Sequence, residues 1–135
     1  MVTQGTIGTQ QLEWLASALD GWQTKPAIIV AHHNPRLGGD PLHSPGGLID
    51  SQELWNVIGM RKWVKAYIHD RSYAEHQGIH ILNTPATSYV ADPKKSTTGW
   101  TTAKLTASGV TLTTHTTDVQ HPWNGESKTL TWRGA

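Results

Sequence analysis

A run of five apolar residues, Ala27 to Ala31, ends in two adjacent histidines, His32 and His33, and then in a proline-containing turn. A short run of small and β-branched residues is typical of a strand covered on both faces, as in the centre of a parallel sheet. Open α/β sheets bind ligands beyond the carboxyl ends of their strands, so this position favours metal ligation or proton transfer. The alternative is that two polar residues simply close a strand.

The first 85 residues alternate between helical and strand patterns, which predicts an α/β arrangement. Thr9 is placed to cap the first helix, and Asp50 with Glu53 is placed to open the second. We expect helices near 9–20 and 51–62, and core strands near 27–32, 64–68 and 79–82.

The chain changes character after Pro85, where helical patterns stop and threonine-rich alternation begins. This pattern predicts antiparallel strands, with turns at 107–109 and at Asn124–Gly125. The expected strands are a short one at 89–90 and longer ones at 99–106, 110–117 and 129–133. No linker divides the chain, so we predict one domain, 1–135, with an α/β part (1–85) and an antiparallel part (86–135).

Composition excludes several classes of function. A net charge of +1 with scattered Lys and Arg gives no footprint for nucleic acid or an acidic membrane. The absence of cysteine excludes disulfides, thiolate zinc sites and thiol nucleophiles. Neither a signal peptide nor a bilayer-spanning segment is expected, and the compartment stays unknown. Tryptophans 14, 22, 55, 63 and 100 are predicted to serve in core or inter-layer packing.

Four segments occur in an order and spacing that resemble a known superfamily. They are Gly8-Thr-Gln-Gln-Leu-Glu-Trp-Leu15, Ile-Val-Ala-His-His-Asn-Pro, Val64-Lys-Ala-Tyr-Ile68 and Gly78-Ile-His-Ile-Leu-Asn-Thr-Pro85. Together they resemble the C-terminal half of a calcineurin-like metallophosphoesterase. The resemblance implies half of a sandwich fold, with a mixed sheet, two flanking helices and a C-terminal antiparallel segment.

The resemblance also implies roles for residues at the strand ends. His32 corresponds to a metal ligand, His33 to a catalytic neighbour near the substrate, and Asn34 and Arg36 to substrate-binding positions. His69 matches the surviving histidine of a shortened Gly-His-x-His motif, and Asp70 is a possible third ligand. The metal implied is Mn, Fe or Zn.

The remaining metal motifs of the superfamily, Asp-x-His, Gly-Asp-x-x-Asp and Gly-Asn-His, are absent from this sequence. Two histidines without those carboxylates predict a weak mononuclear site and no dinuclear centre. One hypothesis is therefore a portion of a metal-dependent phosphoesterase acting on phosphate mono- or diesters, incomplete as a catalyst alone. The other is a non-catalytic scaffold or binding domain with the same fold. We expect a homo-oligomer, a homodimer first of all, or a complementary N-terminal half as partner.

Overall fold

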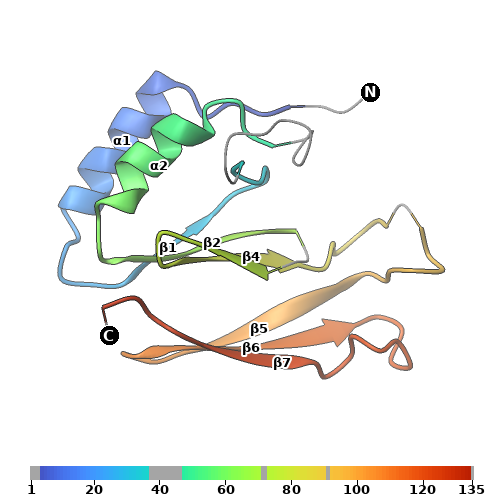
Figure 1. Ribbon diagram of the computed structural model, residues 1–135. Helices are drawn as coiled ribbons and strands as arrows, with labels where there is room; N and C mark the ends of the chain where they lie inside the picture. The colour runs from blue at the N-terminus through green and yellow to red at the C-terminus, as the bar shows by residue number, and fades with distance from the viewer. Residues whose placement is uncertain (1–3, 37–46, 71–72, 91, 135) are drawn as a thin grey trace.

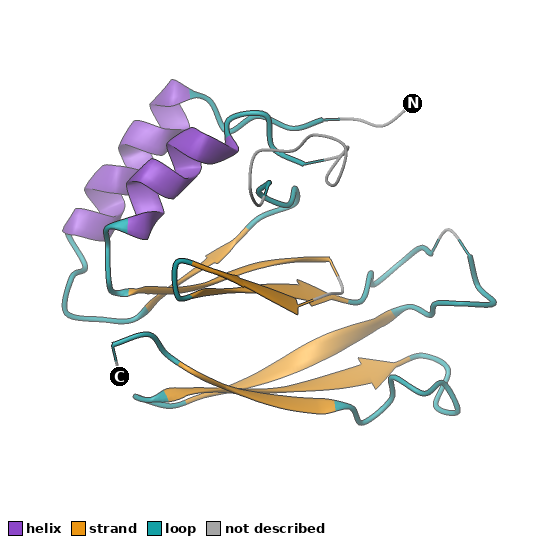
Figure 2. Ribbon diagram, viewed as in Figure 1, coloured by secondary structure: helices purple, strands orange, loops and turns teal. Residues whose placement is uncertain are grey.

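The computed structural model describes residues 4–36, 47–70, 73–90 and 92–134, without the side chains of residues 67–70 and 83. Within these ranges the chain forms three layers: a helical pair, a mixed sheet and an antiparallel sheet (Figures 1 and 2). The elements are α1 (Thr9–Asp20), β1 (Ala27–Val30), α2 (Ser51–Gly59), β2 (Val64–Asp70), β3 (Tyr73–His76), β4 (Ile79–Thr84), β5 (Gly99–Leu105), β6 (Gly109–Thr116) and β7 (Ser127–Thr131).

The mixed sheet has the strand order β1-β2-β4-β3, with β1, β2 and β4 parallel and β3 antiparallel to β4. The apolar run at 27–31 was expected to be a central strand. Within the described ranges it is not: β1 lies at an edge of the sheet and ends at Val30. Both faces of β1 are nevertheless covered. Ile29 packs on the cluster beneath the helices, and Ile28 packs on the cluster between the sheets. An apolar run indicates that both faces of a strand are covered. It does not indicate that the strand has a hydrogen-bonded neighbour at each edge.

The helical layer and the mixed sheet enclose the larger core. Leu54, Ile58, Val64 and Ile79 have no exposed surface. On the other face of the mixed sheet, a second cluster joins the two sheets; it contains Ala66, Leu82, Val110, Leu130 and Trp132. The predicted α/β class, with two flanking helices and a C-terminal antiparallel segment, is confirmed.

Both helix ends differ from the sequence-based expectation. Thr9 is the first helical residue of α1, and Gly8 occupies the N-cap position. Asp50 occupies the N-cap position of α2, but its side chain makes no capping hydrogen bond there. The second helix ends at Gly59, earlier than predicted, because the guanidinium of Arg133 binds the carbonyl oxygens of Ile58 and Gly59. Carbonyls at a helix end otherwise lack intrahelical partners, so a long-range donor can fix the point of termination.

Strand β3 was not predicted, and residues 89–90, predicted as a strand, form none. Strand β3 has four residues, which are too few to give a recognisable alternating pattern. Arg71 and Ser72, which precede it, lie outside the described residues. The packing prediction for tryptophan holds for Trp55 and for Trp63, which packs against the larger core, but Trp14, Trp22 and Trp100 are exposed. The three C-terminal strands and both turns agree with prediction to within two residues. No helix within the described ranges is long and apolar enough to cross a membrane.

Candidate functional site

The carboxyl ends of β1, β2 and β4 lie along one edge of the mixed sheet. Val30 is in register with Ile68, and His69 is in register with Asn83. His32 follows Val30 by two residues, so the backbone brings His32, His69 and Asp70 to the same edge. The side chains of His69 and Asp70 lie outside the described part of the structure. Their assignment as metal ligands therefore stays a prediction.

The two histidines after β1 form a compact pair. Their ring centroids are 4.9 Å apart and the ring planes are inclined by 82°. His32 is exposed and His33 is half-buried. A Cβ at Gly5 would overlap the His33 ring, so only glycine fits at that position without a shift. Gly5 was not identified from the sequence, because its role depends on a contact 28 residues away.

The turn after the histidines is held by the start of α2. The Ser51 hydroxyl accepts a hydrogen bond from the Arg36 backbone N–H (2.7 Å) and donates one to the Leu48 carbonyl (2.6 Å). Trp55, one turn further on, donates its indole N–H to the Arg36 carbonyl at 2.9 Å. Ser51 and Trp55 are both buried. They fix the path of the turn on a rigid element, although sequence reasoning gave neither a functional role.

A short backbone ladder ties the same turn to the N-terminal segment. Leu48 donates its N–H to the Asn34 carbonyl at 2.8 Å, and Ile49 donates to the Gly5 carbonyl at 2.9 Å. Gly5 and Leu48 form an isolated parallel bridge. Three chain segments, around residues 5, 34 and 48, thus converge beside the histidine pair.

Two buried polar atoms of the turn have no hydrogen-bond partner in the described structure. They are Oδ1 of Asn34 and Nε of Arg36. Buried polar groups are nearly always paired, so an exception needs a physical explanation, and a bound ligand or solvent molecule is one such explanation. Asn34 and Arg36 are the two residues that the resemblance assigned to substrate binding. Their role in substrate binding stays a prediction.

Asp50, also near the turn, is already engaged elsewhere. Its carboxylate accepts hydrogen bonds from the Gly8 N–H (2.7 Å), the Ile7 N–H (2.9 Å) and the Thr6 hydroxyl (2.9 Å). Desolvation alone would raise the pKa of Asp50, but these donors outweigh it and hold the pKa below its usual value. Asp50 therefore joins the start of α1 to the start of α2.

The described donors do not by themselves complete a metal site. Among the residues with described side chains, no group of three His, Cys, Asp or Glu is placed to hold a metal ion. One or two imidazoles bind a divalent ion weakly, since catalytic sites normally use at least three protein ligands. The strand-end edge thus fits a metal only when His69, Asp70 or a partner adds ligands to His32.

Comparison with known proteins identifies relatives of one kind. No protein-family model matches the sequence. The chain is 28% identical over 119 residues to a 3',5'-cyclic adenosine monophosphate phosphodiesterase, CpdA, of Vibrio vulnificus, a match covering 80% of this chain and 43% of that protein. It is 29% identical over 97 residues to a 3',5'-cyclic-nucleotide phosphodiesterase of Nostoc sp., covering 69% of this chain and 36% of that protein.

A solved structure shares the fold. A dimetal phosphatase from Danio rerio superposes with a TM-score of 0.63 at 16% identity, covering 93% of this chain and 38% of that one. The chain spans less than half the length of the curated relatives that it matches. These matches confirm the resemblance to calcineurin-like metallophosphoesterases that the sequence motifs indicate, for part of the length of such proteins.

Proposed function

We propose that this chain is a portion of a calcineurin-like metallophosphoesterase and that it supplies the histidine-bearing side of a metal-dependent phosphoesterase site. One observation carries the proposal: the parallel register of β1 and β2 brings His32 to the same sheet edge as His69 and Asp70. Cyclic-nucleotide phosphodiesterases among the relatives favour phosphodiesters of nucleotides as the substrate class.

The residues at the strand ends have different proposed roles in such a site. His32, exposed at the strand end, is the ligand, together with His69 and Asp70. These residues would hold a divalent ion, which would supply Lewis-acid chemistry for phosphoryl oxygens and would activate water as the nucleophile. His33, packed against Gly5, presents its ring next to the ligand and can exchange a proton with a substrate oxygen.

Asn34 and Arg36 are the groups proposed to orient the phosphoester. The Arg36 backbone is bound at both its N–H and its carbonyl by Ser51 and Trp55, so its side chain starts from a fixed point. A guanidinium presents several donors in one plane, which matches the oxygens of a phosphoryl group. Positioning of this kind contributes to catalysis because the substrate need not be reoriented in the transition state.

Equilibrium dialysis of the chain against Mn²⁺ tests the metal half of the proposal. We expect weak binding of one ion per chain, and His32→Ala should reduce the affinity by at least about tenfold. His115→Ala is the matched control, because His115 lies in the other sheet, on β6, where its ring stacks on Trp100. Binding that His32→Ala leaves unchanged would favour the non-catalytic scaffold.

Turnover by the chain alone is expected to be negligible, because the carboxylate motifs of the superfamily are absent from its sequence. Hydrolysis of a phosphodiester is to be measured with Mn²⁺, Fe²⁺ or Zn²⁺ added in turn. Metal-dependent turnover that His32→Ala abolishes would show that the chain is a complete catalyst and that this expectation is wrong.

A further inference from the structure

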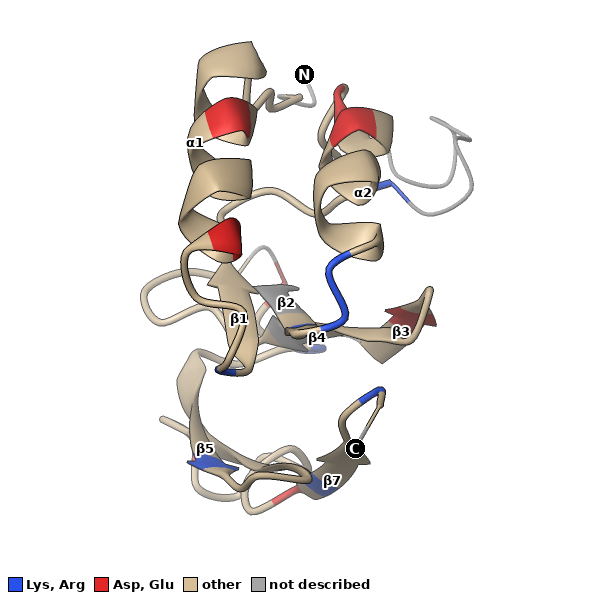
Figure 3. Cartoon of the chain, turned by 90° about the vertical axis from the view of Figure 1, so that its left-hand side faces the viewer, with Lys and Arg blue, Asp and Glu red and all other residues tan. Residues whose placement is uncertain are grey.

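Strand β3 places His76 against the helical layer. Side chains alternate along a strand, so Ala74 and His76 lie on one face of β3 and Tyr73 lies on the other. Ala74 packs against the core beneath the helices, whereas Lys128 of the other sheet lies over the Tyr73 ring. His76 therefore faces the helices, and α2 and β3 lie on the same side of the molecule, away from α1 and β1 (Figure 3).

The ring of His76 lies against the indole of Trp55. The two ring centroids are 4.4 Å apart and the ring planes are inclined by 45°. Trp55 is buried and His76 is half-buried. The same indole donates its N–H to the Arg36 carbonyl at 2.9 Å. One side chain of α2 thus contacts β3 and the turn after the histidine pair at the same time.

The hairpin of β3 and β4 fixes the position of His76. His76 is in register with Ile79, which has no exposed surface. Gln77 and Gly78 lie between them and both have positive φ, 53° and 75°, as a two-residue hairpin turn of type I′ requires. Arg133 donates to the Gln77 carbonyl at 2.8 Å. A hairpin held in this way presents His76 to α2 at a fixed place.

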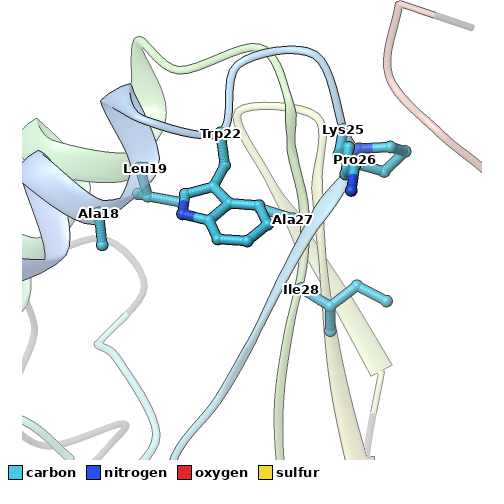
Figure 4. A pocket seen from close by; sticks show the side chains of 7 residues that line it. All are labelled: Ala18, Leu19, Trp22, Lys25, Pro26, Ala27 and Ile28. Atoms are coloured by element: carbon cyan, nitrogen blue, oxygen red, sulfur yellow. The ribbon is translucent and has the colours of Figure 1, made fainter.

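A second tryptophan lies in a contrasting environment. Trp22, just after α1, is 61% exposed and lines an open groove of about 330 Å³ beside the start of β1 (Figure 4). The Lys25 ammonium lies 5.4 Å from its ring centroid. The start of β1 is the end of that strand remote from His32, so Trp22 provides a comparison for the enclosed Trp55.

The contact between His76 and Trp55 matters because a hydrogen bond depends on direction. An N–H···O bond weakens steeply as its angle decreases, and the outer torsion of a tryptophan side chain is broad. The indole therefore needs contacts on its ring to keep its N–H directed at the Arg36 carbonyl. Without that bond, a carbonyl of the turn loses its donor and the backbone at Arg36 gains freedom.

We propose that His76 is a positioning residue for the turn that carries Arg36. Its ring holds the Trp55 indole in the orientation that binds the Arg36 carbonyl. The effect passes from β3 through α2 to the turn and requires no contact between His76 and a substrate. For its consequence in binding, the inference rests on the proposed role of Arg36 in orienting a phosphoester.

Hydrogen exchange of the Trp55 indole N–H, followed by NMR, tests the contact directly. We expect His76→Ala to accelerate this exchange at least about fivefold, and His76→Phe, which retains a ring, to restore slow exchange. The amides of β6 should keep their wild-type rates in both variants, which separates a local effect from a general loss of stability. Trp22→Phe is the control and should leave the exchange at Trp55 unchanged.

Titration of the chain with inorganic phosphate then tests the consequence for the site. We expect weak binding that Arg36→Ala abolishes, that His76→Ala weakens at least about threefold, and that His76→Phe preserves. Indole exchange unchanged in His76→Ala would overturn the inference. Phosphate affinity unchanged in His76→Ala, while Arg36→Ala abolishes binding, would overturn it equally. Binding that Arg36→Ala leaves unchanged would count against the proposed function instead, and the indole exchange would still decide the role of His76.

Discussion

An arginine lies near each end of α2, and the two differ in how many of their side-chain donors the protein itself binds. At its carboxyl end, Arg133 donates five hydrogen bonds, to the carbonyls of Ile58, Gly59, Arg61, Val64 and Gln77. At its amino end, Arg36 has a buried Nε with no partner in the described structure. The first guanidinium is saturated by the protein itself, and the second is not. The contrast separates a residue that holds the fold from one that we propose orients a substrate.

The carboxyl end of α2 should show the largest effect. Arg133→Ala would leave five carbonyls of the helix end and strand starts without their donor, and we expect a loss of about 3 kcal/mol or more in the free energy of unfolding. Arg133→Lys should recover only part of it, because an ammonium cannot reproduce the planar arrangement of donors. Urea denaturation measures both. Equal stability of Arg133→Ala and the wild type would remove the basis of the comparison.

Ser51, at the amino end, should show the next largest effect. Ser51→Ala removes the acceptor of the Arg36 N–H and the donor to the Leu48 carbonyl at a buried position. We expect a loss of about 1 to 2 kcal/mol in urea denaturation. Faster amide exchange at Asn34 and Arg36 should accompany it, because the turn loses its attachment. Gln52→Ala, an exposed neighbour on the same helix, is the control and should change neither measurement.

Asp50 should give a smaller, pH-dependent effect. Its pKa is lowered in the folded chain by hydrogen bonds from Gly8, Ile7 and Thr6 that outweigh desolvation. Its contribution to stability is therefore complete above the ordinary value of 3.8 and is lost as the pH falls through the folded-state pKa. Asp50→Asn should cost about 1 kcal/mol at pH 7 and progressively less below pH 4. A difference from wild type that stays constant between pH 7 and pH 2 would contradict this assignment.

Arg36 should show the smallest effect on stability. Arg36→Ala removes a side chain whose Nε has no partner in the described residues, and we expect a change within about 0.5 kcal/mol. In thermal unfolding, Arg36→Ala should leave the midpoint nearly unchanged, whereas Arg133→Ala should lower it. A loss comparable to that of Arg133→Ala would show that Arg36 holds the fold and is not reserved for a ligand.

The sequence predicted the elements whose signal is local. The periodic positions of α1, the apolar cores of β2 and β4, and the threonine-rich hairpin of β5 and β6 are all read within a short window. It did not predict that β1 is an edge strand, because an apolar run reports coverage of the faces and not the number of neighbours. The end of α2 was also missed, since it depends on Arg133, which lies more than 70 residues away.

Some residues of the candidate site were likewise predicted from the sequence, and others were not. The position of His32 and His33 at a strand end, and the choice of Asn34 and Arg36, followed from the motif and its resemblance. Gly5, Ser51 and Trp55 did not, because each acts through one contact between distant segments. The roles of the histidines and of Asp70 as ligands remain predictions, as does the division into 1–85 and 86–135 within one domain.

Paramagnetic broadening by Mn²⁺ in the NMR spectrum of the chain tests the central claim most directly, because it locates the ion without requiring turnover. We predict that substoichiometric Mn²⁺ selectively broadens the amides of residues 32–36 and 69–70. His32→Ala should abolish this effect and His115→Ala should preserve it. Broadening centred on His115 or His121, or broadening that is unchanged in His32→Ala, would contradict a metal site at the strand ends.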